Sequence, residues 1–513
     1  MQNKKLAKWL LASVLVWPCS AHAQFNWPYQ IKDGTVITQV PERPAGQENA
    51  LKLRAEKIPV VRVAFVGLGS RGQGSIRRWV YQEGVQIVAL CDVEHSRVVK
   101  ANEELRKFGL PPADLYTGDK AYQDVCKRKD VDLVFIATDW LNHFPIAQCA
   151  LLNGKHTAIE VPAAMNMHEI WELINLAERT RKHCMMLENC CYDFFEMNTL
   201  NMAQHGIFGE IIYTMGAYRH DLGDNWDRYW KKNADDKLGW RLEYNMKHRG
   251  DIYPTHGLGP IAQLLDIHRG DRMKTLVAMD SKSVNGRKYA SKNLGTKVTD
   301  FRQGDHTTTL IGTANGKVLE IHHNTMSHQP YNRMYQVTGS EGFANKYPTE
   351  GYALTKTGMK TAGIDKTGTY EEGEEYMSAD DFERLAKKYE NPLITRYVKK
   401  AKEVGGHGGM DYIMDSRLVY CLQHGLPLDI DVYDMAEWCC LAELGSISLD
   451  NGNLPVEVPD FTRGHWKDVS GFRYAFAPKA EEEAQDLANH AFTLRLKSSA
   501  EQLWKQYDRK NKR

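Results

Sequence analysis

Residues 60–72 read Val-Val-Arg-Val-Ala-Phe-Val-Gly-Leu-Gly-Ser-Arg-Gly, an apolar strand pattern that runs directly into a Gly-x-Gly-x-x-Gly motif. A helical pattern follows over about residues 73–80, and a second apolar strand, Gln86–Leu90, leads to Asp92. A strand, a glycine turn, a helix, a strand and an acidic residue in this order are the parts of a dinucleotide-binding βαβ unit. The stretch therefore predicts a parallel sheet that binds a nucleotide at its carboxyl edge.

The three glycines and the acidic residue of this unit each have a predicted role. Gly67 forms the tight turn, Gly69 lets the backbone approach the pyrophosphate, and Gly72 lets the helix pack closely on the strand. The pyrophosphate is expected at the helix N-terminus, where free N–H groups and the helix dipole favour anions. Asp92 is expected to bind the adenosine ribose and to repel a 2′-phosphate, so the motif predicts NAD rather than NADP.

The alternation of strand and helix continues beyond this unit. Further strands are predicted at residues 132–137, 157–160 and 184–187, and a helix over 167–182 precedes the last of them. Such alternation is typical of a doubly wound parallel sheet. We assign residues 59–197 to an N-terminal Rossmann domain of the α/β class.

After about Asn198 the pattern changes to longer strands with alternating polar and apolar residues. These strands are predicted at residues 211–218, 275–283, 307–312, 317–323 and 334–339, with a helix at 260–266. They indicate a C-terminal substrate-binding α+β domain over residues 198–475, built on an open, mostly antiparallel sheet. Within it we expect a surface loop at 347–375, which is rich in Gly, Thr and charge, and helices at 380–389 and 411–424; a separate C-terminal helix covers 476–513.

The N-terminal residues resemble an export signal. Lys4, Lys5 and Lys8 precede a short apolar run, and Ala21-His22-Ala23 is a small-x-small cleavage site. We expect residues 1–23 to be a signal peptide cleaved near Ala23, which would place the mature protein in the periplasm or outside the cell. The apolar run is too short to span a bilayer, and no later segment is long and apolar enough to do so. Residues 24–58, with several prolines and little periodicity, are expected to be an extended arm.

The composition excludes several kinds of partner. A formal net charge of +1 gives no electrostatic footprint for nucleic acid or for an anionic membrane. Ten cysteines include Cys19 in the signal, and the nine others lack the spacing of a zinc site, so we expect no disulfide framework. His322 and His323 are adjacent on a predicted strand and must face opposite sides, so we predict no catalytic metal.

Later motifs carry a family resemblance. The sequence contains Glu160-Val161-Pro162-Ala163, Trp140-x-x-His143, Trp240-Arg241 and Tyr253-Pro254-Thr255-His256-Gly257-Leu258-Gly259. With the glycine motif and Asp92, they resemble glycoside hydrolase family 109, a group of NAD-dependent α-N-acetylgalactosaminidases within the Gfo/Idh/MocA oxidoreductase superfamily. Ordinary members of the superfamily carry a catalytic lysine in Glu-Lys-Pro. Val161 replaces that lysine here, which argues against a standard sugar dehydrogenase.

The resemblance implies a hydrolysis without net oxidation. NAD takes a hydride from C3 of the sugar, the C2 proton becomes acidic, the C1 group is eliminated, water adds, and C3 is reduced again. This route differs from the paired-carboxylate route of most glycosidases. It also implies a tightly bound NAD regenerated in every turnover, a terminal α-linked N-acetylgalactosamine in a glycan or small molecule as substrate, and a possible homo-oligomer. The alternatives are a Gfo/Idh/MocA-type sugar oxidoreductase and a carbohydrate-sensing protein without catalysis.

The resemblance finally implies individual site residues. His256 is the expected catalytic residue, because imidazole exchanges protons near neutral pH, and Tyr253 is its expected partner. Substrate contacts are expected from Arg241, Tyr253, Pro254, Thr255, His256, Tyr331, Tyr218 and Tyr192, with Tyr335 as the alternative to Tyr331. Cofactor contacts are expected from Gly67, Gly69, Ser70, Arg71, Gly72, Asp92, Trp140, His143, Glu160, Val161 and Asn189. His407 and Asp411 fit either a pocket wall or a capped glycine turn, and we assign them no role.

Overall fold

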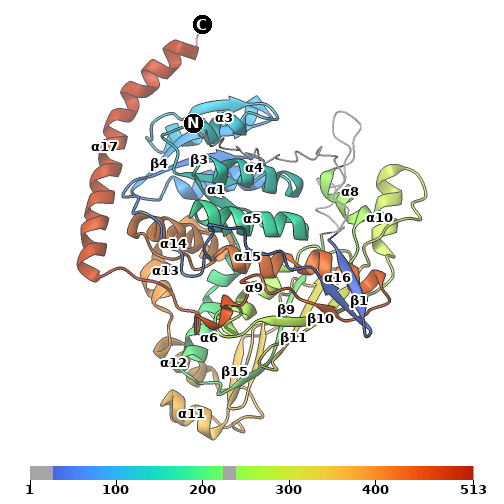
Figure 1. The fold of residues 1–513 in the computed structure, drawn as a ribbon. Coiled ribbons are helices and arrows are strands. Elements are labelled where there is room, and N and C mark those ends of the chain that lie inside the picture. The colour runs from blue at the N-terminus through green and yellow to red at the C-terminus, as the bar shows by residue number, and fades with distance from the viewer. Residues whose placement is uncertain (1–26, 223–238, 512–513) are drawn as a thin grey trace, which may run out of the picture.

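The computed structural model describes residues 27–222 and 239–511. The expected signal peptide, residues 1–23, lies outside the described residues. The described chain forms two sheets with helices around them, one sheet in the upper half of Figure 1 and the other in the lower half.

The first sheet has six strands, all parallel, in the order β5-β4-β3-β6-β7-β8. These strands are β3 (Val61–Val66), β4 (Val85–Asp92), β5 (Asp114–Thr117), β6 (Leu133–Ile136), β7 (His156–Ile159) and β8 (Cys184–Met186). The helices between them are α1 (Ser70–Trp79), α2 (His95–Lys107), α3 (Tyr122–Lys127), α4 (Trp140–Leu152) and α5 (Met167–Thr180). The predicted doubly wound Rossmann domain is confirmed. The strand order reverses between β3 and β6, and ligands bind at such a switch point, outside the carboxyl ends of the strands.

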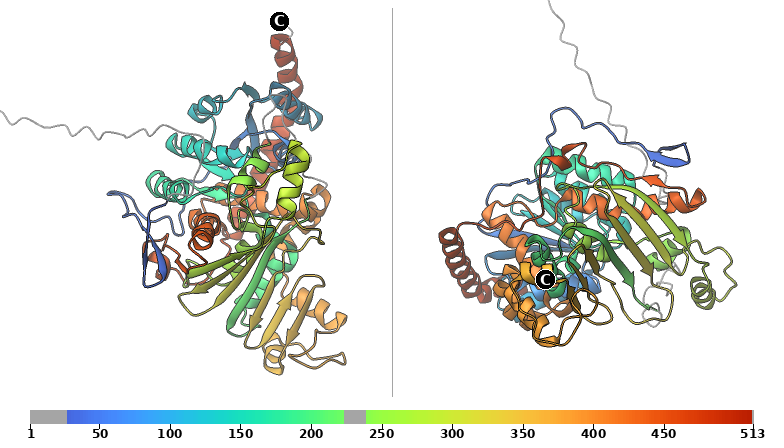
Figure 2. Two further views of the ribbon diagram at one scale, coloured as in Figure 1. Left: turned by 90° about the vertical axis from the view of Figure 1, so that its right-hand side faces the viewer. Right: turned by 90° about the horizontal axis from the view of Figure 1, so that it is seen from below.

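The second sheet has ten strands in the order β1-β2-β16-β10-β11-β12-β9-β13-β14-β15. It is mostly antiparallel, as predicted, although β12 runs parallel to β9 and β16 runs parallel to β2. Its strands are β1 (Tyr29–Lys32), β2 (Thr35–Thr38), β9 (Ile211–Arg219), β10 (Met273–Asp280), β11 (Thr307–Thr313), β12 (Val318–Asn324), β13 (Gln336–Gly339), β14 (Gly342–Asn345), β15 (Gly351–Leu354) and β16 (Val456–Glu457). Figure 2 shows that one face of this sheet is covered by helices and the other is open.

Two parts of this sheet were not expected from the sequence. The arm contains the hairpin β1–β2, which joins the sheet through β16. The expected surface loop at 347–375 is wrong in part, because it contains β15 and the helix α11 (Lys356–Ala362). All four residues of β15 are buried, and β15 pairs antiparallel with the neighbouring strand β14, so burial and pairing in a hairpin form a strand where the local composition favours a loop.

The remaining helices fill the space around both sheets. They are α6 (Phe194–Gln204), α8 (Trp240–Lys247), α9 (Thr255–Leu264), α10 (Asn285–Leu294), α12 (Ala379–Lys388), α13 (Pro392–Val404), α14 (Met410–His424), α15 (Val432–Cys439), α16 (Leu441–Asp450) and α17 (Lys479–Asn511), with 3-10 turns η1 (Asn189–Tyr192), η2 (His407–Gly409) and η3 (His465–Lys467). Helix α14 packs on β3, and α15 packs on α5 and β8. Late segments of the chain therefore cover the nucleotide-binding sheet.

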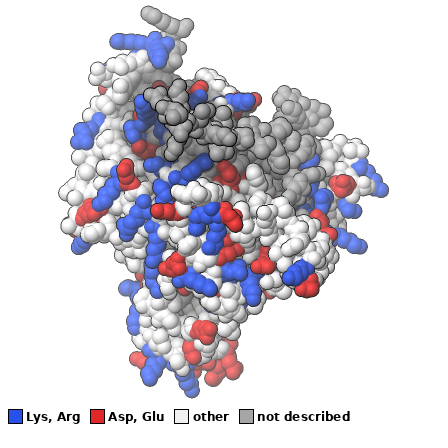
Figure 3. Space-filling view, in the orientation of Figure 1, with Lys and Arg blue, Asp and Glu red and all other residues white. Residues whose placement is uncertain are grey.

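Helix α17 runs along the outer side of the Rossmann domain (Figures 1 and 2). The indole Nε1 of Trp504 donates to the Leu110 carbonyl at 2.8 Å, and the buried Asn489 exchanges hydrogen bonds with Gln423. No described helix is both long and apolar enough to span a membrane. Figure 3 shows acidic and basic side chains interspersed over the visible described surface, in agreement with the balanced charge.

Helix α9 lies directly on the backbone of β9 at Gly216 and Gly257. A Cβ atom on Gly257 would lie 2.4 Å from the Ala217 nitrogen, and one on Gly216 would lie 2.2 Å from the Gly257 oxygen. The glycine pair therefore sets the distance between β9 and the first turn of α9, where His256 lies.

Gly257→Ala is expected to lower the free energy of unfolding by about 1–3 kcal/mol, because the new methyl group collides with the backbone of β9. Urea unfolding measures the effect. Gly445→Ala in α16 is the control, since its Cβ would meet only Ala278 at 3.8 Å, and we expect a gain of about 0.4–1 kcal/mol. Equal unfolding midpoints for Gly257→Ala and the parent protein would contradict the close approach.

His268 lies buried in a cluster of charges between α9, α15 and the loop before α15. Its Nδ1 lies 2.9 Å from Glu437 Oε2, its Nε2 lies 3.4 Å from Asp431 Oδ1, and Arg269 binds Asp434 with two hydrogen bonds. Burial and Arg269 oppose a charge on the imidazole, but Asp431, Asp434 and Glu437 outweigh them and raise the pKa of His268 to about 10.

This cluster predicts a pH-dependent stability. The folded protein keeps the His268 proton between about pH 6.5, the unfolded value, and pH 10, so stability should fall by about 1.4 kcal/mol per pH unit as the pH rises through this window. Below pH 6.5 the contribution is fully present. His268→Gln should remove this slope in urea unfolding at pH 6.5, 7.5 and 8.5. Parallel pH profiles for the parent and the variant would refute the assignment.

Candidate functional site

A cavity of about 1010 Å³ lies at the carboxyl edge of the parallel sheet. Its walls come from the ends of β3, β4, β6 and β7, from the starts of α1 and α4, and from segments of the second sheet and α9. One open space therefore joins the predicted nucleotide site to the predicted sugar site, as the two site predictions require.

The glycine turn is shaped to admit a phosphate at the start of α1. Gly67 has φ +90°, and a Cβ there would lie 2.6 Å from the Ala137 carbonyl; a Cβ on Gly72 would lie 2.0 Å from the Gly67 oxygen. A Cβ on Gly69 would meet no atom within 4 Å, and no side chain caps the helix. The free N–H groups of the first turn therefore open into the cavity, next to Ser70 and Arg71, and this geometry fits a pyrophosphate.

Asp92 ends β4 beside this turn and lines the cavity. Its Oδ2 accepts the Leu68 N–H at 2.6 Å, and its Oδ1 accepts the Glu94 N–H at 2.9 Å. Arg97, which the sequence analysis did not select, pairs with Asp92 at 3.2 Å and also faces the cavity. The carboxylate is held in one orientation, with a lone pair of Oδ2 left for a ribose hydroxyl.

Four predicted cofactor residues lie at the ends of β6 and β7. Trp140, His143, Glu160 and Val161 all line the cavity. His143 is buried, its Nδ1 2.8 Å from the Pro162 carbonyl and its Nε2 3.2 Å from that of Thr138, so the imidazole lies between the two strand-end loops. Burial holds the pKa of His143 below its ordinary value.

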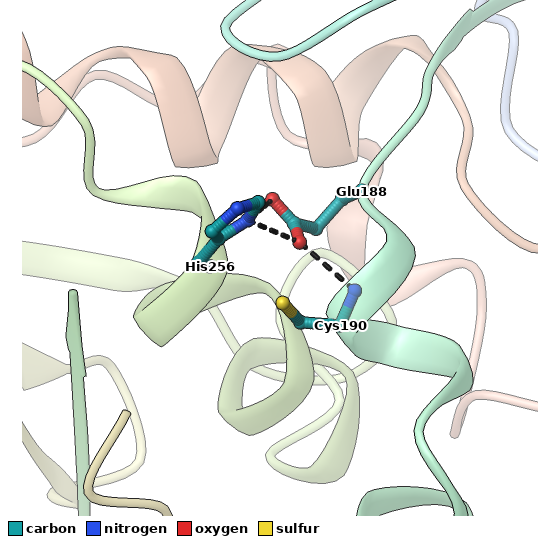
Figure 4. Close-up of side chains that lie close together, drawn as sticks. All are labelled: Glu188, Cys190 and His256. Atoms are coloured by element: carbon teal, nitrogen blue, oxygen red, sulfur yellow. Dashed lines mark hydrogen bonds and ion pairs between the residues drawn. The ribbon is translucent and has the colours of Figure 1, made fainter. Parts of the chain in front are cut away.

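His256 and Glu188 form a hydrogen-bonded pair at the cavity wall (Figure 4). The His256 Nδ1 lies 2.7 Å and 2.9 Å from the two Glu188 carboxylate oxygens, and the Cys190 N–H donates to Oε1 at 3.0 Å. Burial opposes ionisation of Glu188, but the charge and hydrogen bond of His256 outweigh it and lower the pKa of this carboxyl. The pairing orients the imidazole and leaves Nε2 as the ring nitrogen available to the cavity.

Aromatic rings and Arg241 surround this pair. The Tyr253 and Tyr218 rings lie 5.0 Å and 5.2 Å from the His256 ring, and the Arg241 guanidinium lies 4.8 Å over Trp140 and 5.5 Å over Tyr253. Burial raises the pKa of Tyr253 well above its ordinary value, so its phenol keeps the proton. These side chains together offer apolar ring faces and hydrogen-bond donors, a combination that suits the binding of a sugar.

The other predicted substrate residues are placed less directly. Tyr331 is not among the residues that line the cavity; it is 43% exposed, with its ring 5.0 Å from that of His220, which does line it. Pro254 and Thr255 are buried at the start of α9 and position His256. The structure does not bring Tyr192 to the cavity wall, because its ring is buried in η1 and its hydroxyl donates to Asp429 at 3.3 Å.

Several cavity residues were not selected from the sequence. The residues that line the wall include His220, Trp240, His407 and Asp411. Glu188 supports the wall through its hydrogen bond with His256. Glu188 lies two residues after the end of β8, a position at the carboxyl edge where functional side chains gather, and this was the available signal. Among the described residues that line the cavity there is no lysine.

Two side-chain groups have metal-ligand chemistry: Glu188, Cys190 and His256 lie within reach of one ion, as do His268, Asp431 and Asp434. In both, a histidine nitrogen is already bonded to a carboxylate. The absence of a catalytic metal stays a prediction.

Comparison with known proteins finds a separate family model for each of the two parts of the chain. Residues 61–188 match the model of the oxidoreductase family with an NAD-binding Rossmann fold, and residues 192–468 match that of the glycosyl hydrolase 109 C-terminal domain. Glycosyl hydrolase family 109 protein 5 of Phocaeicola vulgatus is 58% identical over 94% of this chain and 92% of its own length. Protein 1 of Bacteroides thetaiotaomicron is 52% identical over 92% of this chain and 100% of its own.

Solved structures share the fold. Levoglucosan dehydrogenase in complex with NADH and L-sorbose has a TM-score of 0.56 and 18% identity, covering 79% of this chain and 100% of its own. A probable dehydrogenase from Thermotoga maritima has a TM-score of 0.51 and 15% identity, covering 77% and 98%.

Proposed function

Because the chain belongs to glycosyl hydrolase family 109 and carries an NAD-binding Rossmann domain, we propose that it hydrolyses terminal α-linked N-acetylgalactosamine with a retained NAD. The observation that supports this proposal best is the His256–Glu188 pair on the wall of the nucleotide cavity. It is a proton-transfer group, and no lysine of the dehydrogenase type lines the described cavity.

When bound, NAD supplies reversible oxidation at C3 of the sugar, which makes the C2 proton acidic. His256 is the base for a sugar proton, since the carboxylate of Glu188 fixes Nδ1 and leaves Nε2 to accept it. The phenol of Tyr253, whose pKa is raised well above its ordinary value, keeps its own proton, so it donates a hydrogen bond rather than acting as the base. Glu188 touches no substrate and is a positioning residue.

Arg241 and Tyr218 form the proposed sugar subsite, and Trp140, a proposed cofactor contact, borders it. The Arg241 side chain is held by stacking on Trp140, so its guanidinium keeps one orientation toward sugar hydroxyls or the acetamide. Tyr218 lines this space from β9, and Tyr331, in the loop before β13, has its ring 6.5 Å from that of Tyr218 and is a further proposed substrate contact.

Gly67, Gly69, Ser70, Arg71 and Asp92 are the proposed contacts of the pyrophosphate and adenosine ribose. Glu160, Val161 and Asn189, at the ends of the next strands, are the proposed contacts of the nicotinamide half. We propose that the protein is exported and that its signal peptide is cleaved near Ala23. Free NAD is scarce outside the cytoplasm, so a cofactor that is restored in each turnover is an advantage there.

The test is release of 4-nitrophenol from its α-N-acetylgalactosaminide by purified protein without added NAD, with the β-anomer and the α-glucosamine analogue as controls. We expect release from the α-galactosamine substrate alone. No release, even after NAD is added, would contradict the proposal. Growth of NADH absorbance without phenol release would instead identify a sugar oxidoreductase.

A further inference from the structure

Asp411, at the start of α14, forms hydrogen bonds with several side chains around the predicted nucleotide site. It is 1% exposed, and its carboxylate accepts hydrogen bonds from Arg71 Nη1 at 2.9 Å, Asn189 Nδ2 at 2.6 Å and His407 Nδ1 at 2.9 Å. Arg71 also donates to Glu160 at 2.6 Å. Asp411 thus connects the phosphate-binding helix α1 with the ends of β7 and β8, although it lies more than 200 residues further along the chain.

The turn that carries His407 has an unusual backbone. Residues 405–409 all have positive φ, at +80°, +88°, +46°, +76° and +115°. Four of them are glycine, for which this region is accessible, but His407 is not. A Cβ on Gly406 would also lie 2.7 Å from Arg78 and 2.8 Å from Asp411, so the turn is pressed against α1 and α14. Strained residues of this kind gather at ligand-binding sites.

The turn and the start of α14 lie at the wall of the cavity. Gly406, His407 and Asp411 line the same space as Gly67, Gly69 and Arg71. The His407 side chain is 59% exposed, and its Nδ1 also lies 3.4 Å from Arg71 Nη1 and 3.3 Å from Asn189 Nδ2. With Nδ1 turned to this group, Nε2 is the nitrogen left for a ligand.

We propose that His407, held in its left-handed conformation by the Gly405–Gly409 turn and by Asp411, contacts the pyrophosphate–ribose part of NAD and slows its release. This inference rests on the proposed retention of NAD. It assigns a cofactor contact to a residue outside the glycine motif, supplied by the late segment of the chain that folds back on the Rossmann domain. The His407 Nε2 atom bonds a ribose hydroxyl, or a phosphate oxygen when the imidazole is protonated.

The experiment measures the exchange of bound NAD. Protein loaded with radiolabelled NAD is chased with excess unlabelled NAD, and the label that remains bound is counted over time. His407→Asn is the main variant, because asparagine tolerates a positive φ and lacks the imidazole. His465→Asn is the matched control, since His465 is a half-exposed histidine bonded at 2.7 Å to a nearby aspartate, Asp468, outside the cavity.

The half-life of bound NAD is expected to fall about tenfold in His407→Asn, the effect of one hydrogen bond, and to stay at the parent value in His465→Asn. A His407→Gly variant, which also relieves the backbone, should release NAD as fast as His407→Asn while melting no earlier than the parent. Equal half-lives in the parent and both His407 variants would overturn the proposal. Label exchange requires no turnover, so its outcome is separate from whether the sugar is hydrolysed.

Discussion

His256→Gln is expected to lower kcat for the α-N-acetylgalactosaminide by roughly 10²- to 10⁴-fold, the usual contribution of a general base. Glutamine can still donate a hydrogen bond to Glu188, so the buried carboxylate keeps a partner. The amide cannot accept a proton from the sugar. His256→Ala would leave Glu188 buried and unpaired as well, and would mix a loss of stability with the loss of chemistry.

His268→Gln is the matched control for this variant. His268 is also a buried histidine bonded to a glutamate, at 2.9 Å from Glu437, but it lies outside the cavity. Its variant should keep the parent kcat at pH 6.5 while losing stability. Bound NAD, read as the absorbance ratio after gel filtration, should be equal in all three proteins. A His256→Gln enzyme with more than a tenth of parent kcat would show that another group is the base.

Glu188→Gln is expected to reduce kcat by roughly 10²-fold or more, with a much smaller change in KM. The carboxylate accepts from Nδ1 and so presents Nε2 unprotonated to the cavity. A neutral amide in its place neither favours that tautomer nor stabilises the imidazolium that forms when the proton is taken. Because Glu188 touches no substrate, the substitution is expected to lower kcat and to leave KM nearly unchanged.

Glu437→Gln supplies the comparison, since Glu437 is a buried glutamate in an equivalent histidine pair outside the site. Both variants should melt earlier than the parent, and only Glu188→Gln should lose activity. The pH profile separates positioning from general destabilisation, because a structural defect scales the whole profile while a change at His256 reshapes its acid limb. Unaltered kcat and profile in Glu188→Gln would contradict the positioning role.

The nucleotide domain could be predicted because its signals are local. The run from Val60 to Gly72 contains a buried strand, its turn and the start of its helix within a few residues, and the structure places β3 and α1 there. The family resemblance carried by these and later motifs is confirmed.

The missed elements depend on distant partners. The hairpin β1–β2 joins its sheet through β16, which lies more than 400 residues later. All eight residues of α15 are buried, so the helix lacks the one-sided apolar pattern that identifies a helix in a sequence.

The site residues also fall into two classes: some belong to local motifs, and others depend on contacts with distant parts of the chain. Residues within motifs, such as Gly67, Asp92 and His256, lie on one cavity as expected. Glu188 was missed because its role arises only when the fold brings it beside His256, 68 residues away. Tyr192 was expected to contact the substrate, but the 3-10 turn places its ring in the core, with its hydroxyl bonded to Asp429.

The central claim is an oxidation–elimination route served by retained NAD and His256, and hydrolysis in heavy water tests it most directly. The aryl α-N-acetylgalactosaminide is hydrolysed without added NAD, and the released sugar is examined by NMR. The account predicts deuterium at C2 of the product, because the proton removed there exchanges with solvent before it is returned. Product with hydrogen retained at C2 would contradict the account, because it would mean either direct displacement at C1 or return of the same proton without exchange.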